Sequence, residues 1–192
     1  MISTLELLRK RRSLPPHQLV EPGPNKAQIA ELLELAARVP DHGKLAPWRF
    51  IVIEGDARHQ LGEVAAQIVQ TDRPEADAET MQREKGRFSR APVVIALVSR
   101  ARKHPKIPVW EQHLSAGAAA MNLLVASEAM GFSAVWVTEW CSFDRRMLDV
   151  LGLAADETMA GFIHIGTPSL PLDERTDKTR PVMAEIISYF GG

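Results

Sequence analysis

The helical pattern over residues 111–130 is the longest in the chain, and its side chains are unusually small. Its first half reads Ser115-Ala116-Gly117-Ala118-Ala119-Ala120, and Gly131 stands where a glycine ends a helix. The distance at which a helix packs depends on the side chains at the contact, so small residues on every face allow close approach on all sides. We therefore expect this helix to be the buried spine of the fold or of a subunit interface.

The remaining patterns alternate between helices and strands without a regular strand–helix–strand rhythm. The continuous apolar run Val93–Val98 indicates a strand at the centre of its sheet. Further strands are predicted over 48–53, 134–138 and 161–166, and helices after Ser3, after Asn25, from Asp56 and over 145–151. Residues 71–90 are polar and indicate a peripheral helical excursion that covers a site. This order favours an α+β fold, and the absence of repeats or linkers predicts a single domain over residues 1–192.

The composition of the 192 residues limits the class of protein. With 45% hydrophobic and 24% charged residues, the chain reads as soluble and globular. A formal net charge of −1 favours neither nucleic acid nor an anionic membrane as a partner. A single cysteine, Cys141, excludes an intrachain disulfide framework and a cysteine-rich metal site. No apolar run resembles a signal core or a membrane span, so we expect a cytoplasmic protein.

The polar loop from Pro40 runs directly into the strand that begins at Trp48. Proline ends the helix before it, and Gly43 permits a sharp turn or a close approach to a ligand. Asp41, His42 and Lys44 lie within four positions on this loop. The segment is either a binding loop on a rigid scaffold or an ordinary helix-to-strand connection with solvated charges.

The cluster Arg11-Arg12-Ser13 follows the first helix and also has two interpretations. Two guanidinium groups and a hydroxyl can hold a phosphate through charge-assisted hydrogen bonds. Alternatively, the arginines complement the helix dipole at a C-terminus. Lys178 and Arg180 form a second cationic group, which strengthens the case for an anion site only if the fold brings the two groups together.

Other catalytic and ligand signatures are absent or weak. There is no Walker loop, no GxGxxG after a strand and no nucleophile elbow, and the histidines lack metal-ligand spacing, so we expect no metal. His164 is interpreted as a core or interface histidine and Cys141 as an inert small residue. Trp136 and Trp140 are either core aromatics or walls for a planar cofactor.

Taken together, these segments resemble the FMN-dependent nitroreductase family, most closely its short, minimal YdjA-like subgroup. The resemblance covers nearly the whole chain and lies in the order and spacing of several motifs. These are Arg11-Arg12-Ser13, the Pro40 loop ending in Pro47-Trp48-Arg49-Phe50, Val109-Trp110-Glu111-Gln112 before the small-residue helix, Gly131–Trp136, Gly161–Pro168 and Arg180-Pro181.

The resemblance implies a nitroreductase-type sandwich, in which helices flank a central mixed, mainly antiparallel sheet, and an intertwined homodimer. FMN would lie at the dimer interface, contacted by both chains. The implied reaction is ping-pong: NAD(P)H gives a hydride to flavin N5, and the reduced flavin passes electrons to a nitroaromatic, a quinone or a similar acceptor. No side chain is expected to be a nucleophile or an essential base, because the flavin carries the chemistry.

The resemblance also implies roles for individual residues. Arg11, Ser13 and Arg180 would bind the phosphate and ribityl end of FMN, with Arg12 in support. The implied ring contacts are Pro40, Asp41, His42, Lys44, Trp136, Val137 and Thr138, some of them from the second subunit. Arg38 is also expected to bind the cofactor. Many family members carry Asn and Gln where this loop has Lys44 and Ala46, and a cation at 44 would stabilise the anionic reduced flavin.

Two other functions remain open from the sequence. The same fold supports other flavin chemistry, such as dehalogenation or flavin fragmentation. A non-catalytic flavin-binding dimer would show the same cofactor motifs and the same small-residue helix.

Overall fold

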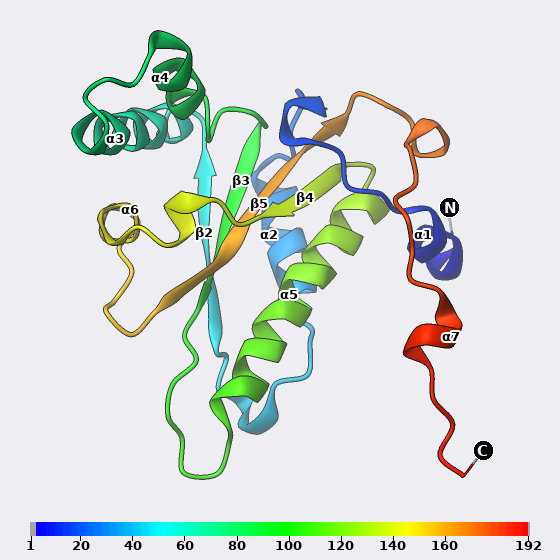
Figure 1. Ribbon diagram of the computed structural model, residues 1–192. Coiled ribbons are helices and arrows are strands. Elements are labelled where there is room, and N and C mark those ends of the chain that lie inside the picture. Colours follow the sequence, from blue (N-terminus) through cyan, green and yellow to red (C-terminus); the bar gives the residue numbers. More distant parts are fainter. Residues whose placement is uncertain (1–2, 192) are drawn as a thin grey trace.

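A five-stranded sheet with helices on both faces forms the body of the protein, whose computed structural model describes residues 3–191 (Figure 1). The strands are β1 (Leu19–Val20), β2 (Trp48–Glu54), β3 (Val93–Ser99), β4 (Ser133–Val137) and β5 (Thr158–Pro168). The helices are α1 (Thr4–Lys10), α2 (Lys26–Ala36), α3 (Ala57–Asp72), α4 (Ala78–Lys85), α5 (Val109–Ala129), α6 (Arg145–Val150) and α7 (Met183–Ile186). Every strand pair of the described residues is antiparallel. The predicted α+β class is confirmed, with a sheet that is antiparallel rather than mixed within this part of the chain.

Strand β3 is buried along its whole length because both of its faces are covered. It pairs with β2 on one side and with β5 on the other. Its residues Val93, Ile95 and Leu97 pack with α2 and α5, whereas Val94, Ala96 and Val98 pack with α3, α6 and β5. The two cores explain why the run from 93 to 98 is continuously apolar, and they confirm its central position.

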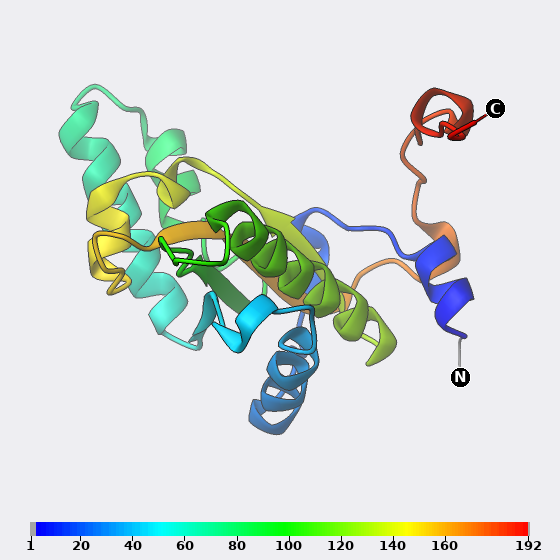
Figure 2. The same ribbon diagram turned by 90° about the horizontal axis from the view of Figure 1, so that it is seen from below.

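Helix α5 is the spine that its small residues predict. Ala116, Ala119 and Ala120 are at most 1% exposed against the sheet and α2. The opposite side of the helix carries exposed apolar side chains at Trp110, Leu114 and Met121. Seen from below, α5 crosses the sheet between α2 and the segment that holds β4 (Figure 2).

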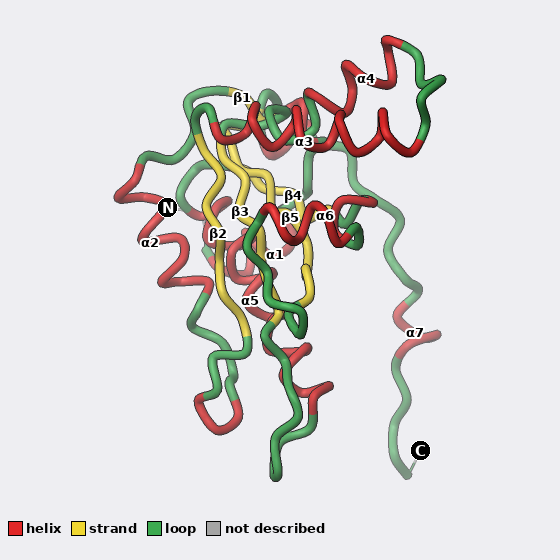
Figure 3. Tube along the Cα trace, turned by 90° about the vertical axis from the view of Figure 1, so that its left-hand side faces the viewer, coloured by secondary structure: helices red, strands yellow, loops and turns green. Residues whose placement is uncertain are grey.

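The polar segment over residues 71–90 forms the end of α3 and all of α4, which fold back on each other at the periphery of the sheet (Figure 3). A Cβ at Gly62 would lie 2.0 Å from the Lys85 carbonyl oxygen, so only glycine permits this packing of α3 on α4. The helical excursion is confirmed, but it is not wholly surface: Glu84 and Arg87 are buried as an ion pair at 2.6 Å.

The C-terminal segment extends away from the body (Figures 1 and 2). Its apolar side chains are exposed at Val182, Met183, Ile186, Tyr189 and Phe190, the last of them completely. The sequence predicts that this tail docks on the body or on a partner. Within the described residues the tail does not dock on the body, and its docking on a partner stays a prediction.

Candidate cofactor-binding site

The fold brings together the two cationic groups that are far apart in sequence. Arg12 donates to Asp177 Oδ2 at 2.6 Å, and Arg180 donates to Asp177 Oδ1 at 3.3 Å. One carboxylate therefore joins the end of α1 to the tail. Arg180 of the second cationic group thus lies beside Arg12 of the first, which strengthens the case for an anion site that itself stays a prediction.

Arg11 and Arg12 differ in what they do at the end of α1. Arg12 donates to the carbonyl oxygens of Arg9 and Arg11 at 2.6 and 2.9 Å, which is the helix-capping role. The half-buried Arg11 makes one side-chain hydrogen bond within the described chain, a long one of 3.3 Å to Ser13 Oγ.

The surroundings of Arg11 carry a surplus of positive charge. Burial lowers the pKa of the Arg11 guanidinium, Glu128 opposes the shift, and the cations of Arg180, Arg12 and Arg175 add to it. A guanidinium that is under-bonded, half-buried and beside other cations is suited to a bound dianion such as a phosphate ester.

Arg175 anchors this cluster and was not foreseen from the sequence. It is buried and pairs with Glu128 of α5 at 2.7 Å, while also donating to the Arg12 carbonyl oxygen at 3.1 Å. Burial raises the pKa of Glu128, and the Arg175 cation opposes that shift. The pair fixes the start of the tail against α5 and β4, and thereby places Asp177 and Arg180 beside Arg12.

The Pro40 loop is held in a defined shape by its own polar groups. Asp41 accepts hydrogen bonds from the backbone N–H groups of Leu45 and Ala46 at 3.1 and 2.8 Å. Ser115 of α5 donates to the Pro40 carbonyl oxygen at 2.7 Å and accepts from the Trp48 indole at 3.1 Å. The loop is thus a preformed structure, although both Asp41 oxygens already have partners.

The rest of the loop is exposed and strained. His42 Nδ1 lies 2.8 Å from the Glu111 carboxylate, and Lys44 is exposed. Lys44 and Ala46 have φ values of 54° and 44°, which side chains other than glycine rarely adopt. Strained backbone of this kind clusters at functional sites. Arg38 is exposed just before the loop.

The end of β4 forms the third part of the predicted site. Trp136 is partly exposed and donates to the Ala160 carbonyl oxygen at 3.0 Å. Val137 is half-buried, and Thr138 is exposed beyond the strand. Leu14 packs in a small core with Val135 nearby, so the segment after Arg11 and Arg12 runs beside β4.

One chain does not gather all of the predicted residues. Ser115, which holds the Pro40 loop, and Glu128, which holds the cation cluster, lie 13 positions apart on α5. At 1.5 Å per residue this is about 20 Å along the helix axis. The loop and the cation cluster therefore lie toward opposite ends of α5 (Figure 1).

The remaining titratable candidates are structural. His164 is buried on β5, and burial lowers its pKa to about 3. Burial raises the pKa of the Cys141 thiol to about 12, which agrees with an inert residue. Residues 3–191 contain no group of acidic, histidine or cysteine side chains able to hold a metal ion. No helix among them is both long and apolar enough to cross a membrane.

The fold of the chain is like that of solved nitroreductase structures. The chain superposes with a TM-score of 0.82 on a nitroreductase-like family protein from Bacillus cereus, over 100% of this chain and 98% of that one at 20% identity. A structure from Desulfovibrio desulfuricans, described as a nitroreductase in complex with FMN, gives a TM-score of 0.74 at 22% identity, over 100% and 99% of the two chains.

The sequence comparisons agree with this fold. Residues 8–167 match the profile of the nitroreductase family. The chain is 31% identical over 189 residues to the "Putative NAD(P)H nitroreductase YdjA" of Escherichia coli, covering 98% of this chain and all of that protein. It is 34% identical over 169 residues to the "Putative NAD(P)H nitroreductase" of Haemophilus influenzae, covering 86% of this chain and 89% of that protein. The chain belongs to the nitroreductase family, a family of oxidoreductase enzymes.

Proposed function

We propose that this protein is an FMN-dependent NAD(P)H oxidoreductase that works by a ping-pong mechanism as a homodimer. Its acceptors would be nitroaromatics, quinones or similar compounds that take two electrons. Bound FMN would accept a hydride from NAD(P)H and then pass two electrons to the acceptor. The side chains of the protein bind and orient these molecules.

The cation cluster around Arg11 is the observation that carries the proposal. Arg11 is half-buried with one long hydrogen bond, and it lies among other guanidinium groups. The phosphate of FMN would supply the missing negative charge and hydrogen-bond acceptors. Arg11, Ser13 and Arg180 would hold this phosphate, with Arg12 beside them.

The homodimer is supported by what a single chain leaves incomplete. The Pro40 loop and the cation cluster lie about 20 Å apart along α5, and a second copy would bring its own loop toward this chain's cluster. The apolar stripe of Trp110, Leu114 and Met121 on α5 and the exposed apolar tail are the surfaces for it. An extended tail that docks on the other copy would make the dimer intertwined.

The ring of the flavin would lie between the Pro40 loop and the end of β4. Asp41 keeps the loop in its conformation, so that Pro40 and His42 present a preformed surface. The Lys44 cation, facing the pyrimidine edge, would stabilise negative charge on the reduced ring. Trp136, Val137 and Thr138 would offer strand backbone to the other face or edge.

The test is colour, mass and turnover of the purified protein. We expect a yellow protein that sediments as a dimer, bleaches with NADH or NADPH and reoxidises with a nitroaromatic or a quinone. Steady-state NAD(P)H oxidation against a panel of acceptors then identifies the acceptor class and the preferred donor. A yellow protein whose flavin neither donor reduces would be a flavin-binding dimer without this activity. A colourless protein that does not bind added FMN would disprove the proposal.

A further inference from the structure

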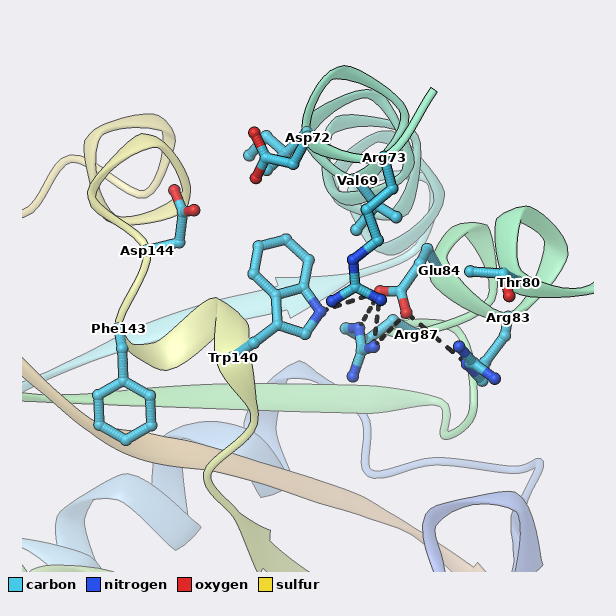
Figure 4. Close-up of a pocket in the computed structure, with 11 residues that line it drawn as sticks. Val69, Asp72, Arg73, Thr80, Arg83, Glu84, Arg87, Trp140, Phe143 and Asp144 are labelled. Carbon is cyan, nitrogen blue, oxygen red and sulfur yellow. Dashed lines mark hydrogen bonds and ion pairs between the residues drawn. The ribbon is translucent and has the colours of Figure 1, made fainter. Parts of the chain in front are cut away.

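A cavity lies outside the residues that the proposed function uses. It has a volume of about 660 Å³ and lies between α3, α4 and the segment that follows β4 (Figure 4). This volume is within the range of pockets that hold small organic ligands. Val69 and Phe143 line it with apolar surface, and Trp140 adds an indole ring.

The Trp140 indole is held in a fixed orientation. Its N–H donates to Glu84 Oε2 at 3.1 Å, and the Arg87 guanidinium lies 5.6 Å from the ring centroid. Glu84 and Arg87 are themselves buried and joined by two hydrogen bonds of 2.6 and 2.7 Å. An aromatic side chain fixed in this way is a ready platform on which a planar ligand can stack.

The acidic groups of the cavity are already neutralised. Asp72 and Asp144 both pair with Arg146, at 2.6 Å in each case. Glu84 accepts hydrogen bonds from Arg87 and from the Trp140 indole. Because each of these carboxylates is paired with a cation, its repulsion of a bound anion is reduced.

Two arginines at the rim remain available. The Arg73 side chain follows the end of α3 and makes no hydrogen bond or ion pair within the described residues; Figure 4 shows it pointing toward Trp140. Arg83 of α4 has a single loose ion pair, 3.7 Å to Glu84, and is 63% exposed. Guanidinium groups of this kind suit phosphate oxygens.

We propose that this cavity binds the adenosine phosphate part of the nicotinamide donor, with the purine against Trp140 and the phosphates on Arg73 and Arg83. This inference rests on the proposed function, because that function requires a dinucleotide donor. Trp140 follows Thr138 by two residues, so the cavity continues directly from the strand end that we place beside the flavin ring. A donor that reaches the ring can extend along this segment.

The test uses two nucleotides that cannot be oxidised: adenosine 2′,5′-bisphosphate, which carries the adenosine phosphates of NADPH, and ADP, the part that NADH and NADPH share. Isothermal titration of the purified protein should show binding, weakened at least about tenfold in the double variant Arg73→Gln/Arg83→Gln. Both arginines are on exposed surface, so this variant should fold as the parent does. Lys103→Gln removes a cation from the exposed loop before α5 and should bind the nucleotide like the parent.

Steady-state kinetics separate the donor from a free nucleotide as the natural ligand. The nucleotide that binds should compete with the preferred donor, and the double variant should raise the KM for that donor about tenfold at unchanged kcat. Binding without competition would overturn the assignment to the donor. Absent binding of both nucleotides, or equal binding by parent and double variant, would overturn the site itself.

The two proposals fail in different ways. A protein that binds no flavin and oxidises no NAD(P)H would disprove the proposed function. The titration does not depend on turnover, so its dependence on Arg73 and Arg83 would still support an adenosine phosphate pocket.

Discussion

Asp177 accepts a hydrogen bond from the Arg12 guanidinium at 2.6 Å, across 165 residues of sequence. The contact ties the base of the exposed tail to the end of α1. It also places a negative charge among the cations that we assign to the FMN phosphate. Asp177 therefore competes with the phosphate for Arg12 and Arg180.

Removing that charge should strengthen FMN binding. Asp177→Asn keeps the shape of the side chain and leaves both guanidinium groups for the phosphate. The carboxylate is about half exposed and screened by solvent, so the gain in affinity should be no more than about fivefold. Fluorescence titration of the apoprotein with FMN measures it. Asp173→Asn, at a more exposed ion pair with Lys10, is the matched control. Weaker binding in Asp177→Asn would mean that the aspartate positions the arginines rather than competing for them.

Arg11→Ala should leave the protein folded but largely colourless. It deletes the half-buried guanidinium whose one hydrogen bond within the described residues is long. Loss of a charge-assisted contact to phosphate should cost about 1.5–3 kcal/mol, or about ten- to a hundredfold in FMN affinity. The ratio of flavin to protein absorbance after purification is the measurement. Arg9→Ala, on the exposed side of α1, should keep its colour. Full flavin occupancy in Arg11→Ala would mean that this cluster only caps helix α1 and does not bind the phosphate.

The exposed tail should be required for the dimer. A chain ending after Arg180 keeps the cation cluster but loses the apolar residues from Val182 to Phe190. We expect sedimentation velocity to show a monomer or an aggregate, and the flavin to be lost with the second copy. The point variant Ile186→Asp should weaken the dimer in the same direction, whereas Glu185→Gln in the same helix should leave it intact. A truncated chain that sediments as a flavin-loaded dimer would contradict this role.

Local signals in the sequence are sufficient for most of the fold. Asn25 and Gln28 form the reciprocal capping box that starts α2, and the run Val93–Val98 marks the strand that is covered on both faces. These features depend on neighbours in sequence or on burial of one continuous segment. Their hydrophobic and capping patterns are therefore visible without the structure.

The parts of the site that depend on distant partners could not be predicted. Arg175 and Glu128 each resemble a surface charge in the sequence, and only the fold shows them as a buried pair. The same holds for Glu84 and Arg87 in a segment that reads as wholly polar. The turn after Pro40 was expected, but positive φ at Lys44 was not, because that conformation is normally a property of glycine.

Asp41 should matter more for the shape of its loop than for direct contact with a ligand. Asp41→Ala removes the acceptor of two backbone N–H groups in a loop with strained residues. We expect a loss of about 1–2 kcal/mol in the free energy of unfolding, together with weaker flavin binding. Asp41→Asn retains one acceptor oxygen and should lie between the parent and the alanine variant. Chemical denaturation of all three proteins without flavin gives the comparison, and equal stabilities would show that the loop does not depend on Asp41.

The Arg49–Glu157 pair should make stability depend on pH in the acid range. Arg49 donates to both Glu157 oxygens at 2.8 Å, and these hydrogen bonds lower the pKa of Glu157 to about 2. The carboxyl of an unfolded chain titrates near its ordinary value of about 4.5. Because the pKa of Glu157 is lower in the folded state, the pair stabilises the fold fully above the unfolded-state value of about 4.5. This contribution is lost as the pH falls from about 4.5 through about 2. The shift corresponds to about 3 kcal/mol, and solvent screening should reduce the contribution to about 1–2 kcal/mol.

Glu157→Gln tests this directly. The variant should be less stable than the parent at pH 7, and the difference should shrink as the pH falls toward 2. Urea unfolding at pH 7, 5, 4 and 3 follows the difference in the free energy of unfolding. Asp156→Asn, at the exposed neighbouring position, should show no comparable convergence. A Glu157→Gln deficit that stays constant over this range would mean that the pair acts through packing and neutral hydrogen bonds, not through the carboxylate charge.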